Sequence, residues 1–405
     1  MRMSKKLIAL LIATLAFSAP TASAQSIPST FEFTGSGYGH GVGMSQFGAR
    51  ALAQSGESAT AILNYFYKDV EVVPFVDTHT IRVNIANLVK SISFATQVPG
   101  ARLEVFEGDV ALAPGLIPIA TFESRKRATF SFGSQSILLS AIARGKAVTL
   151  RWVGDGAVIS MFNGKTTSRY KYGYITIKVL RGALAVTNTM ALRDEYLYGI
   201  SEVSSSWPSA VLEAQAIASR SYALSKLGVV RAVCDCQVYS HISDQNFVGF
   251  SKESEPRFGH LWRAAVDRTI VDTTTSLVVL SGGKPAQTYF FSSSGGATQS
   301  TLDAWGGFTA YTQSVPDTVS VDVKINPRFA SWKASAAQES VAKAFLLPDV
   351  VSLEVLTRNE AGAVTFIAAT SSTGIVKKLR GDTFRSRVKI PSPWFSVVIP
   401  TDPQG

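Results

Sequence analysis

The sequence predicts an α+β protein in which a β-rich unit packs beside a helical core. Between residues 80 and 186, apolar and polar residues alternate, as around Ile81 and Val83, and a period of two indicates half-buried strands. Between residues 191 and 226, apolar residues recur at helical spacing, with a break at 204–208. A run of strands followed by a run of helices is typical of an α+β fold rather than of an alternating α/β one.

The remaining elements are predicted from the same patterns and from turn residues. A short strand at Phe31–Phe33 leads into a glycine-rich stretch and then into a helix over 44–67, which Gly56 interrupts. Strands return from Val271 onward. They are followed by a helix over 335–347, a hairpin formed by 352–356 and 363–368, and a last strand over 394–399.

The N-terminus predicts export. A basic head (Arg2, Lys5, Lys6) precedes an apolar stretch over 7–17, and small residues at 22–24 are typical of a signal-peptide cleavage site. An uncleaved N-terminal anchor is the alternative. We therefore divide the chain into a signal peptide (1–24), a glycine-rich loop with a helix (25–76), a β-rich domain (77–186), a helical catalytic core (187–315) and a C-terminal α+β part of the same domain (316–405).

Charge and cysteine content narrow the possible partners. The formal net charge is +10, and loss of the three basic residues in the signal peptide lowers it to +7. An exported basic protein is attracted to an acidic wall polymer, whereas no basic run with interleaved aromatics suggests nucleic acid. The chain contains two cysteines, so a packed core rather than a disulfide framework must stabilise it.

Glu202 is the candidate catalytic residue. It follows the apolar stretch Tyr198–Ile200, where the chain leaves a helix, so we expect partial burial. Burial raises the pKa of a carboxyl group, and a protonated carboxyl can donate a proton to a leaving glycosidic oxygen. A solvated loop glutamate or a helix-capping carboxylate would look the same in the sequence.

Three further segments are candidates for substrate binding because they are rich in glycine, hydroxyl or aromatic residues. Each has a plain structural alternative, namely a packed turn, a solvated helix face or a serine-rich turn beside a core tryptophan. The candidate binding residues are His40, Gly41, Gln46, Gln215, Arg220, Tyr222, Ser292, Ser293, Ser294, Gly295, Gly296, Asp303 and Trp305.

Cys234, Cys236 and His241 form a candidate metal site. Two thiolates and an imidazole can hold zinc with an open fourth position. A pair of cysteines separated by one residue can also form a short-loop disulfide or remain as free thiols, so zinc is a possible cofactor and not a required one.

Taken together, these segments resemble the SpoIID/LytB proteins of sporulation and wall remodelling. The stretch from Leu192 to Leu224, LRDEYLYGISEVSSSWPSAVLEAQAIASRSYAL, is similar to the core signature of that family, and SSSGGAT, WGG and GDTFRSRVKIPSPWF follow in the family's order. Two features differ from the pattern. GYGHGVGMSQFGA, which normally follows the final WF strand, is here at residues 37–49, and Asp235 stands where zinc-binding members have a histidine.

The displaced segment resembles a circular permutation, which is tolerated when the original termini are adjacent at the surface. It predicts that Phe31–Phe33 lies beside residues 394–399. The resemblance implies a lytic transglycosylase that acts on peptide-stripped peptidoglycan glycan strands, with Glu202 as the essential acid/base. Other members of the family are described as enhancers of a wall amidase, so a non-catalytic enhancer is the alternative. If the enzyme is a hydrolase, Asp303 is the candidate for a second catalytic carboxylate. The expected location is the cell wall, at most peripheral to a membrane.

Overall fold

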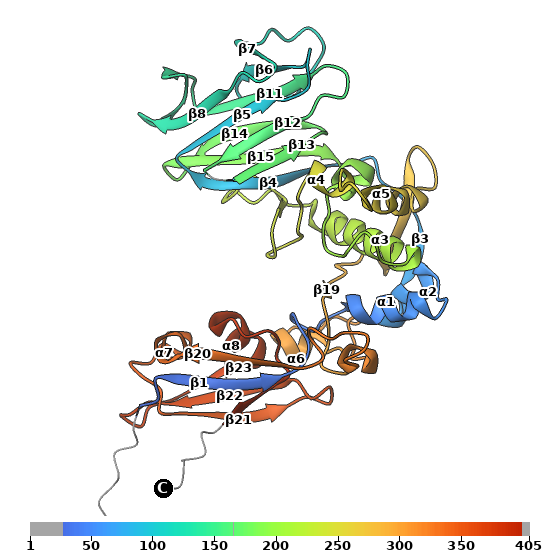
Figure 1. Ribbon diagram of the computed structural model, residues 1–405, viewed down its shortest axis with the longest axis vertical. Coiled ribbons are helices and arrows are strands. Elements are labelled where there is room, and N and C mark those ends of the chain that lie inside the picture. Colours follow the sequence, from blue (N-terminus) through green and yellow to red (C-terminus); the bar gives the residue numbers. More distant parts are fainter. Residues whose placement is uncertain (1–26, 165, 399–405) are drawn as a thin grey trace, which may run out of the picture.

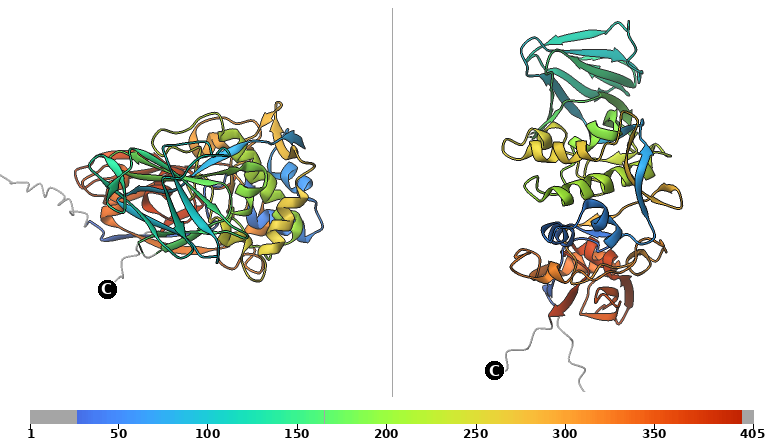
Figure 2. Two further views of the ribbon diagram at one scale, coloured as in Figure 1. Left: turned by 90° about the horizontal axis from the view of Figure 1, so that it is seen from above. Right: turned by 90° about the vertical axis from the view of Figure 1, so that its right-hand side faces the viewer.

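The structure is a computed structural model that describes residues 27–164 and 166–398. The expected signal peptide lies outside these residues. The described chain is mixed α+β, as the sequence predicts, and it forms a C-shaped body with a β lobe above, helices along the spine and a smaller α+β lobe below (Figure 1). Figure 2 shows the same three-part stack from the side. No helix among the described residues is long and apolar enough to cross a membrane.

The upper lobe is a sandwich of two largely antiparallel sheets. Their strand orders are β10-β9-β8-β5-β12-β13 and β16-β4-β15-β14-β11-β6-β7. Apolar side chains from both sheets, such as Phe94 and Leu150, join one core that continues into the helical spine. The strands are β4 (Thr80–Val89), β5 (Ser91–Thr96), β6 (Arg102–Glu107), β7 (Ala120–Glu123), β8 (Ala128–Gly133), β9 (Ser136–Leu139), β10 (Ile142–Ala143), β11 (Ala147–Val153), β12 (Ile159–Asn163), β13 (Thr166–Tyr170), β14 (Tyr174–Leu180), β15 (Ala183–Ala191) and β16 (Val238–Tyr239).

The spine is built around the long helix α3, which contacts α1, α2, α5 and strand β17. The expected break before α3 is present. The chain upstream forms a short π-helical turn, η1, and is not continuous with α3. The spine elements are β2 (Met44–Ser45), α1 (Gln46–Gln54), α2 (Ala59–Phe66), β3 (Glu71–Val76), η1 (Leu192–Tyr196), α3 (Ser209–Lys226), α4 (Phe250–Glu253), α5 (Gly259–Arg268), β17 (Thr275–Ser281), β18 (Lys284–Pro285), β19 (Phe290–Phe291), α6 (Thr301–Trp305) and η2 (Thr318–Val321).

The lower lobe has its own hydrophobic core. Phe33 from the start of the chain packs there with Phe345, Phe384 and Phe395. Buried residues between Ala336 and Phe395 form this cluster together with Phe31 and Phe33 of β1. The elements are β1 (Thr30–Gly35), β20 (Trp332–Ala337), α7 (Gln338–Phe345), β21 (Ser352–Arg358), β22 (Val364–Thr370), β23 (Val376–Arg380), α8 (Gly381–Val388) and β24 (Phe395–Val398).

The two ends of the described chain meet in one sheet of this lobe. Strand β1 lies between β20 and β24, antiparallel to both. Glu32 faces Val398 and Phe33 faces Val397. This pairing confirms the prediction that Phe31–Phe33 lies beside the last strand.

Candidate functional site

Glu202 is held by a short antiparallel contact between two loops. Ile200 bridges to Phe247, and the Ser201 N–H donates to the Asn246 carbonyl at 2.8 Å. Gly199 permits this contact, because a Cβ at that position would lie 2.3 Å from the Phe247 ring. The loop between α3 and α4 therefore fixes the backbone on which Glu202 stands.

The two carboxylate oxygens of Glu202 differ in their surroundings. Oε1 accepts a hydrogen bond from the Asn246 main-chain N–H at 2.6 Å, whereas Oε2 accepts none from the described residues. The Asn246 side chain also donates to the Ser201 carbonyl at 2.7 Å. Burial raises the pKa of Glu202, while the Asn246 N–H and the nearby Lys252 lower it in part. Since Oε1 already accepts an N–H, Oε2 is the oxygen with room to carry and donate a proton.

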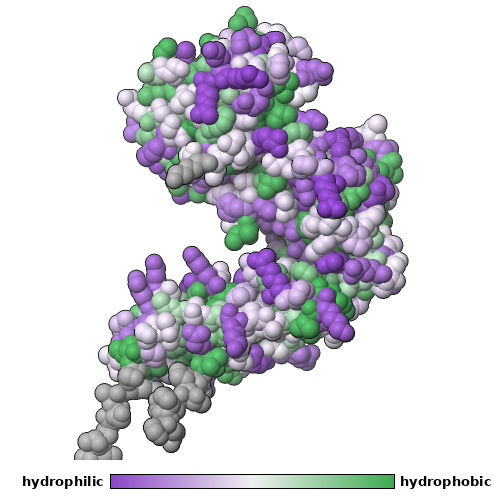
Figure 3. Space-filling model, viewed as in Figure 1, coloured by the Kyte–Doolittle hydropathy of each residue, from purple (hydrophilic) through white to green (hydrophobic). Residues whose placement is uncertain are grey.

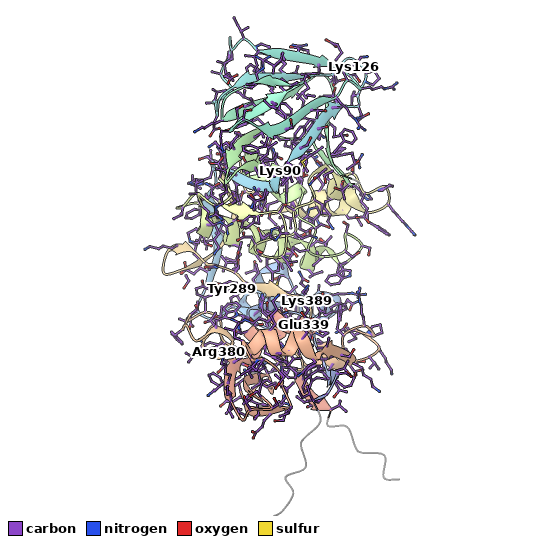
Figure 4. The ribbon with its side chains drawn as sticks, turned by 90° about the vertical axis from the view of Figure 1, so that its left-hand side faces the viewer. Lys90, Lys126, Tyr289, Glu339, Arg380 and Lys389 are labelled. Atoms are coloured by element: carbon purple, nitrogen blue, oxygen red, sulfur yellow. A yellow bond between two sulfur atoms is a disulfide. The ribbon has the colours of Figure 1, made fainter. Side chains whose placement is uncertain are left out.

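A pocket of about 180 Å³ opens in the waist of the molecule. Tyr289 lines this pocket and lies between the upper and lower lobes (Figure 4). It is on the side of the molecule with the hollow that Figure 3 shows in space-filling form. Aromatic rings and one carboxylate line this pocket, which suits the stacking and hydrogen bonding of a sugar ring. Its lining residues are His40, Tyr222, Ile242, Ser243, Asp244, Tyr289, Phe290 and Trp305.

His40 is a neutral ring in this pocket. Its Nδ1 accepts the Val42 N–H at 3.0 Å, and its ring centroid lies 5.3 Å from that of Trp305. Burial lowers its pKa to about 4; Asp382 opposes this shift and Arg385 adds to it. At neutral pH His40 therefore contributes an uncharged face and not a cation.

Trp305 and Asp303 both lie in α6, at the rim. Trp305 is 38% exposed, and its Nε1–H donates to Asp382 in α8 at 2.9 Å. Asp303 accepts from the Ser300 hydroxyl at 2.9 Å at the start of the helix. Trp305 therefore offers a fixed ring to the pocket, while Asp303 is hydrogen-bonded to Ser300, the N-cap of its own helix.

The pocket and Glu202 share the loop between α3 and α4, which lies on the inner side of the C in Figure 1. Asp244, in the pocket, accepts the Tyr222 hydroxyl at 3.0 Å, and Asn246, two residues later, binds Glu202. Burial raises the pKa of Tyr196 well above its ordinary value, and the charges of Glu202 and Asp244 add to the shift. Both acids therefore lie near one buried phenol.

Several predicted binding residues prove to be structural. Arg220 is fully buried and lies 3.4 Å from Asp77, so it cannot reach a substrate. Gln46 donates to Gln215 at 3.2 Å in a buried contact between α1 and α3, which corrects both assignments. These polar groups are inside because α3 is covered by helices and a strand on several sides.

The serine–glycine turn also serves packing. Ser293 and Ser294 are fully buried; Ser293 accepts from Asn326 at 2.7 Å, and Ser294 donates to Asp317 at 2.7 Å. Ser292 uses its carbonyl to accept the Phe47 N–H. The expected sugar-binding role of Ser293 and Ser294 is therefore corrected, because the turn anchors the N-terminal segment instead.

The three predicted glycines lie around this anchor. Gly41 has a φ of +82°, and a Cβ there or at Gly295 would lie within 2.3 Å of the Trp394 ring. These two glycines allow close packing on Trp394. Gly296 has a φ of +118° and no neighbour that a Cβ would meet, so backbone conformation alone favours glycine there.

The cysteine segment does not present a zinc site in this structure. Cys234 and Cys236 are joined by a disulfide, so neither sulfur is a thiolate, and His241 is exposed, with Nδ1 accepting the Ser243 N–H. Asp235 pairs with Arg82 and Lys178 on the β lobe. Over residues 27–164 and 166–398, no three His, Cys, Asp or Glu side chains cluster as a metal site would require. The residues present therefore fit the disulfide alternative and not zinc.

Sequence reasoning missed five residues that build this region, namely Asn246, Lys252, Asp244, Tyr289 and Asp382. Three of them belong to the polar stretch 241–252, in which no spacing distinguishes a ligand from a solvated loop. Their roles depend on contacts with segments more than 20 residues away, such as Asn246 with Glu202 and Asp382 with Trp305.

The comparison with known proteins finds a family model that matches the segment containing Glu202. Residues 181–276 match the family model described as SpoIID, stage II sporulation protein. Residues 181–276 are therefore similar to the SpoIID family. The SpoIID segment contains Glu202, Asn246 and Lys252, and it is shorter than the stretch from residue 80 onward over which the sequence resembles the family.

Two curated relatives match short stretches. The chain is 51% identical over 39 residues to the amidase enhancer of Bacillus subtilis (strain 168), which covers 10% of this chain and 6% of that protein. It is 46% identical over 43 residues to the stage II sporulation protein D of Bacillus amyloliquefaciens, covering 11% of this chain and 12% of that protein. The matched regions are thus small parts of both relatives. The match of residues 181–276 to the SpoIID model supports a role related to the cell wall.

Proposed function

We propose that this protein is an exported lytic transglycosylase that cleaves peptidoglycan glycan strands, with Glu202 as both acid and base. The observation that carries the proposal is the asymmetric setting of the Glu202 carboxyl: Oε1 is occupied by the Asn246 N–H, Oε2 is free among the described residues, and burial raises the pKa. Burial of this kind favours the protonated carboxyl, which can deliver its proton from one oxygen.

The reaction requires one carboxyl group in two roles. In the first step, Oε2 protonates the oxygen between N-acetylmuramic acid and N-acetylglucosamine, and the bond from that oxygen to the anomeric carbon breaks. In the second step, the C6 hydroxyl of the muramic acid attacks the anomeric carbon and returns its proton to Glu202. No water is consumed, and the product ends in a 1,6-anhydro sugar. This scheme differs from the paired carboxylates of most glycoside hydrolases.

The waist pocket would hold a sugar next to the cleaved bond. Trp305 offers a partly exposed ring, and the neutral His40 contributes an apolar edge. Tyr222 and Asp244 form a hydrogen-bonded pair that can contact sugar hydroxyls. Stacking on an aromatic ring and a few placed polar groups are the usual means of orienting such a ligand.

Product analysis tests the proposal. Purified glycan strands, with and without their peptides, are incubated with the wild type, Glu202→Gln and the control Glu213→Gln, which changes a carboxyl on α3 that pairs with Arg268. We expect mass spectrometry to find anhydro-muramyl ends with the wild type and the control, and none above background with Glu202→Gln. Full activity of Glu202→Gln on these strands would rule out the catalytic assignment.

A second candidate function is suggested by the match to the amidase enhancer, which is 51% identical over 39 residues. In that case the protein binds the wall and increases the rate of a wall amidase without cutting glycan. The same strands, assayed with an added amidase, separate the two functions. Rate enhancement by the wild type in the absence of anhydro ends would favour the enhancer.

A further inference from the structure

Lys252 is a buried cation beside the candidate acid. It lies in α4 and is 5% exposed. Its ammonium donates to the Val203 carbonyl at 2.6 Å and lies 5.3 Å from the centroid of the Trp262 ring. Among the described residues it forms no ion pair within 4.0 Å. A buried ammonium without a contacting carboxylate is costly, so its position calls for a reason.

The charges that face Lys252 come from two elements. Glu202 stands on the neighbouring loop, and Glu255 follows α4 and accepts the Ser205 hydroxyl at 2.8 Å. Burial lowers the pKa of Lys252 to about 8, while Glu255 and Glu202 oppose that shift. The other titratable group near Glu202 is Tyr196, whose buried phenol remains neutral. Among the described residues, Lys252 and the Asn246 N–H are therefore the groups that favour a negative charge on Glu202.

We infer that Lys252 is the positioning residue of the Glu202 carboxyl, and that its ammonium stabilises the carboxylate formed when Glu202 gives up its proton. This inference rests on the proposed function and deepens it. The Val203 carbonyl holds the ammonium one residue along the chain from Glu202, so the charge is near the carboxyl and not in direct contact with it.

The spacing explains how Glu202 can act in both steps. A contacting cation keeps a carboxyl ionised and removes its use as an acid. With a more distant buried cation, burial still favours the protonated carboxyl. The ammonium then stabilises the negative charge that appears after proton transfer. The resulting carboxylate persists until it takes the proton of the C6 hydroxyl.

A purely structural role for Lys252 is the competing explanation, because the same ammonium also ties α4 to the Val203 carbonyl. The two roles differ in what they change. A structural tie affects the stability of the fold, whereas a charge effect moves the titration of Glu202. The decisive measurement is therefore a titration and not an activity alone.

The test compares full-length Lys252→Met, Lys252→Gln and Lys252→Arg with the control Lys226→Met. Lys226 is a partly buried lysine on α3 that lies 5.0 Å from the Tyr222 ring and faces Asp244 instead of Glu202. The side-chain carboxyl of Glu202 is followed by ¹³C NMR between pH 3 and 9, with Glu202→Gln identifying its signal. Activity on glycan strands is recorded over the same range.

We expect Lys252→Met and Lys252→Gln to raise the pKa of Glu202 and to lower kcat roughly tenfold or more, with KM little changed. Lys252→Arg and Lys226→Met should leave the titration near that of the wild type. If both neutral variants fold and Glu202 titrates as in the wild type, the inference is overturned, whatever happens to the unfolding temperature. The NMR titration needs no turnover, so a wild type without anhydro products would reject the proposed function alone.

Discussion

Arg220 Nε lies 3.4 Å from Asp77 Oδ2, and neither side chain is exposed. The guanidinium also donates to the carbonyls of Leu277 and Arg193. The pair thus joins α3 to the strand β17 and to the turn before Glu202. Its burial shows why an arginine in the family-like segment contributes to the scaffold and not to substrate contact.

Removing one member of this pair should destabilise the protein. Arg220→Met leaves the Asp77 carboxylate buried without its cation, which costs about 3–5 kcal/mol. Burial already raises the pKa of Asp77, and loss of Arg220 raises it further. A carboxyl whose pKa is raised on folding loses stability as pH rises, so the variant should weaken from pH 4 to pH 7.

Urea unfolding measures this effect. The double variant Asp77→Asn/Arg220→Met is the control, because it removes both charges, and it should recover part of the loss. An Arg220→Met protein within about 0.5 kcal/mol of the wild type at pH 7, the range typical of surface substitutions, would contradict the assignment.

His40 should make stability depend on pH in the opposite direction. Its pKa is about 4 in the folded protein, because of burial, and ordinarily about 6.5 in an unfolded chain. The folded state therefore favours the neutral ring, and its contribution is complete above pH 6.5 and lost as pH falls toward 4. Unfolding temperatures from pH 7 to 4 should fall more steeply for the wild type than for His40→Asn. Parallel curves would show that His40 is not the group responsible.

Trp305 should contribute affinity and not chemistry. Trp305→Ala removes the ring that faces His40 and should weaken glycan binding about tenfold, or 1.4 kcal/mol, with a rise in KM and little change in kcat. Asp382→Asn keeps the ring and weakens the hydrogen bond that orients it, so its effect should be smaller. Trp305→Phe is the matched control and should retain most of the affinity. Equal KM values for all three variants would exclude the ring from the binding site.

The short disulfide should stiffen the loop that carries Asp244. Arg231 next to it pairs with Asp244 at 2.6 Å. Cys234→Ser/Cys236→Ser should lower the unfolding free energy by about 1–2 kcal/mol, as expected for a very short closed loop, and should raise KM through Asp244. EDTA should leave the activity of the oxidised protein unchanged. Stoichiometric zinc in the purified protein, found by elemental analysis, would contradict this prediction.

The sequence predicted most elements because their hydrophobic periods are clear. The strands of the β lobe, the break before α3 and the hairpin of β21 and β22 all follow from local patterns. The expected helix over 335–347 was partly wrong, because its first three residues belong to β20, where Ala334 and Ala336 alternate inward beside β1. Pairing with a strand about 300 residues away overrides a weak local preference.

The site was less predictable, and burial is the reason. The partial burial expected of Glu202 is present, since an apolar stretch precedes it. Polar residues in α3 looked solvated because an alanine-rich helix has no obvious outer face, yet nearly all of it from Val211 to Leu224 is buried. Hydrogen-bond partners such as Gln46 with Gln215 lie far apart in the chain, so no local pattern indicates them.

The pairing of β1 with β24 predicts that the chain tolerates a circular permutation. In the permuted chain the glycine-rich segment follows the last strand, as in the family that the sequence resembles. Val398 faces Glu32, close to the start of β1 at Thr30, so a linker of about four residues can join the two strands as a hairpin. New termini fit between Thr78 and His79, which are both exposed. We therefore expect a variant that begins at His79 and carries residues 29–78 after Val398 to fold.

Circular dichroism and thermal unfolding check this variant. Its spectrum should match that of the wild type, and its activity on glycan strands should persist, because β1 keeps both neighbours and the Gly41 turn still packs on Trp394. The control opens the chain inside α3, between Ala216 and Ile217, which are both buried, and it should not fold. If the variant opened at His79 aggregates as readily as this control, the two strand ends cannot be joined as the pairing implies, and the permutation loses its physical basis.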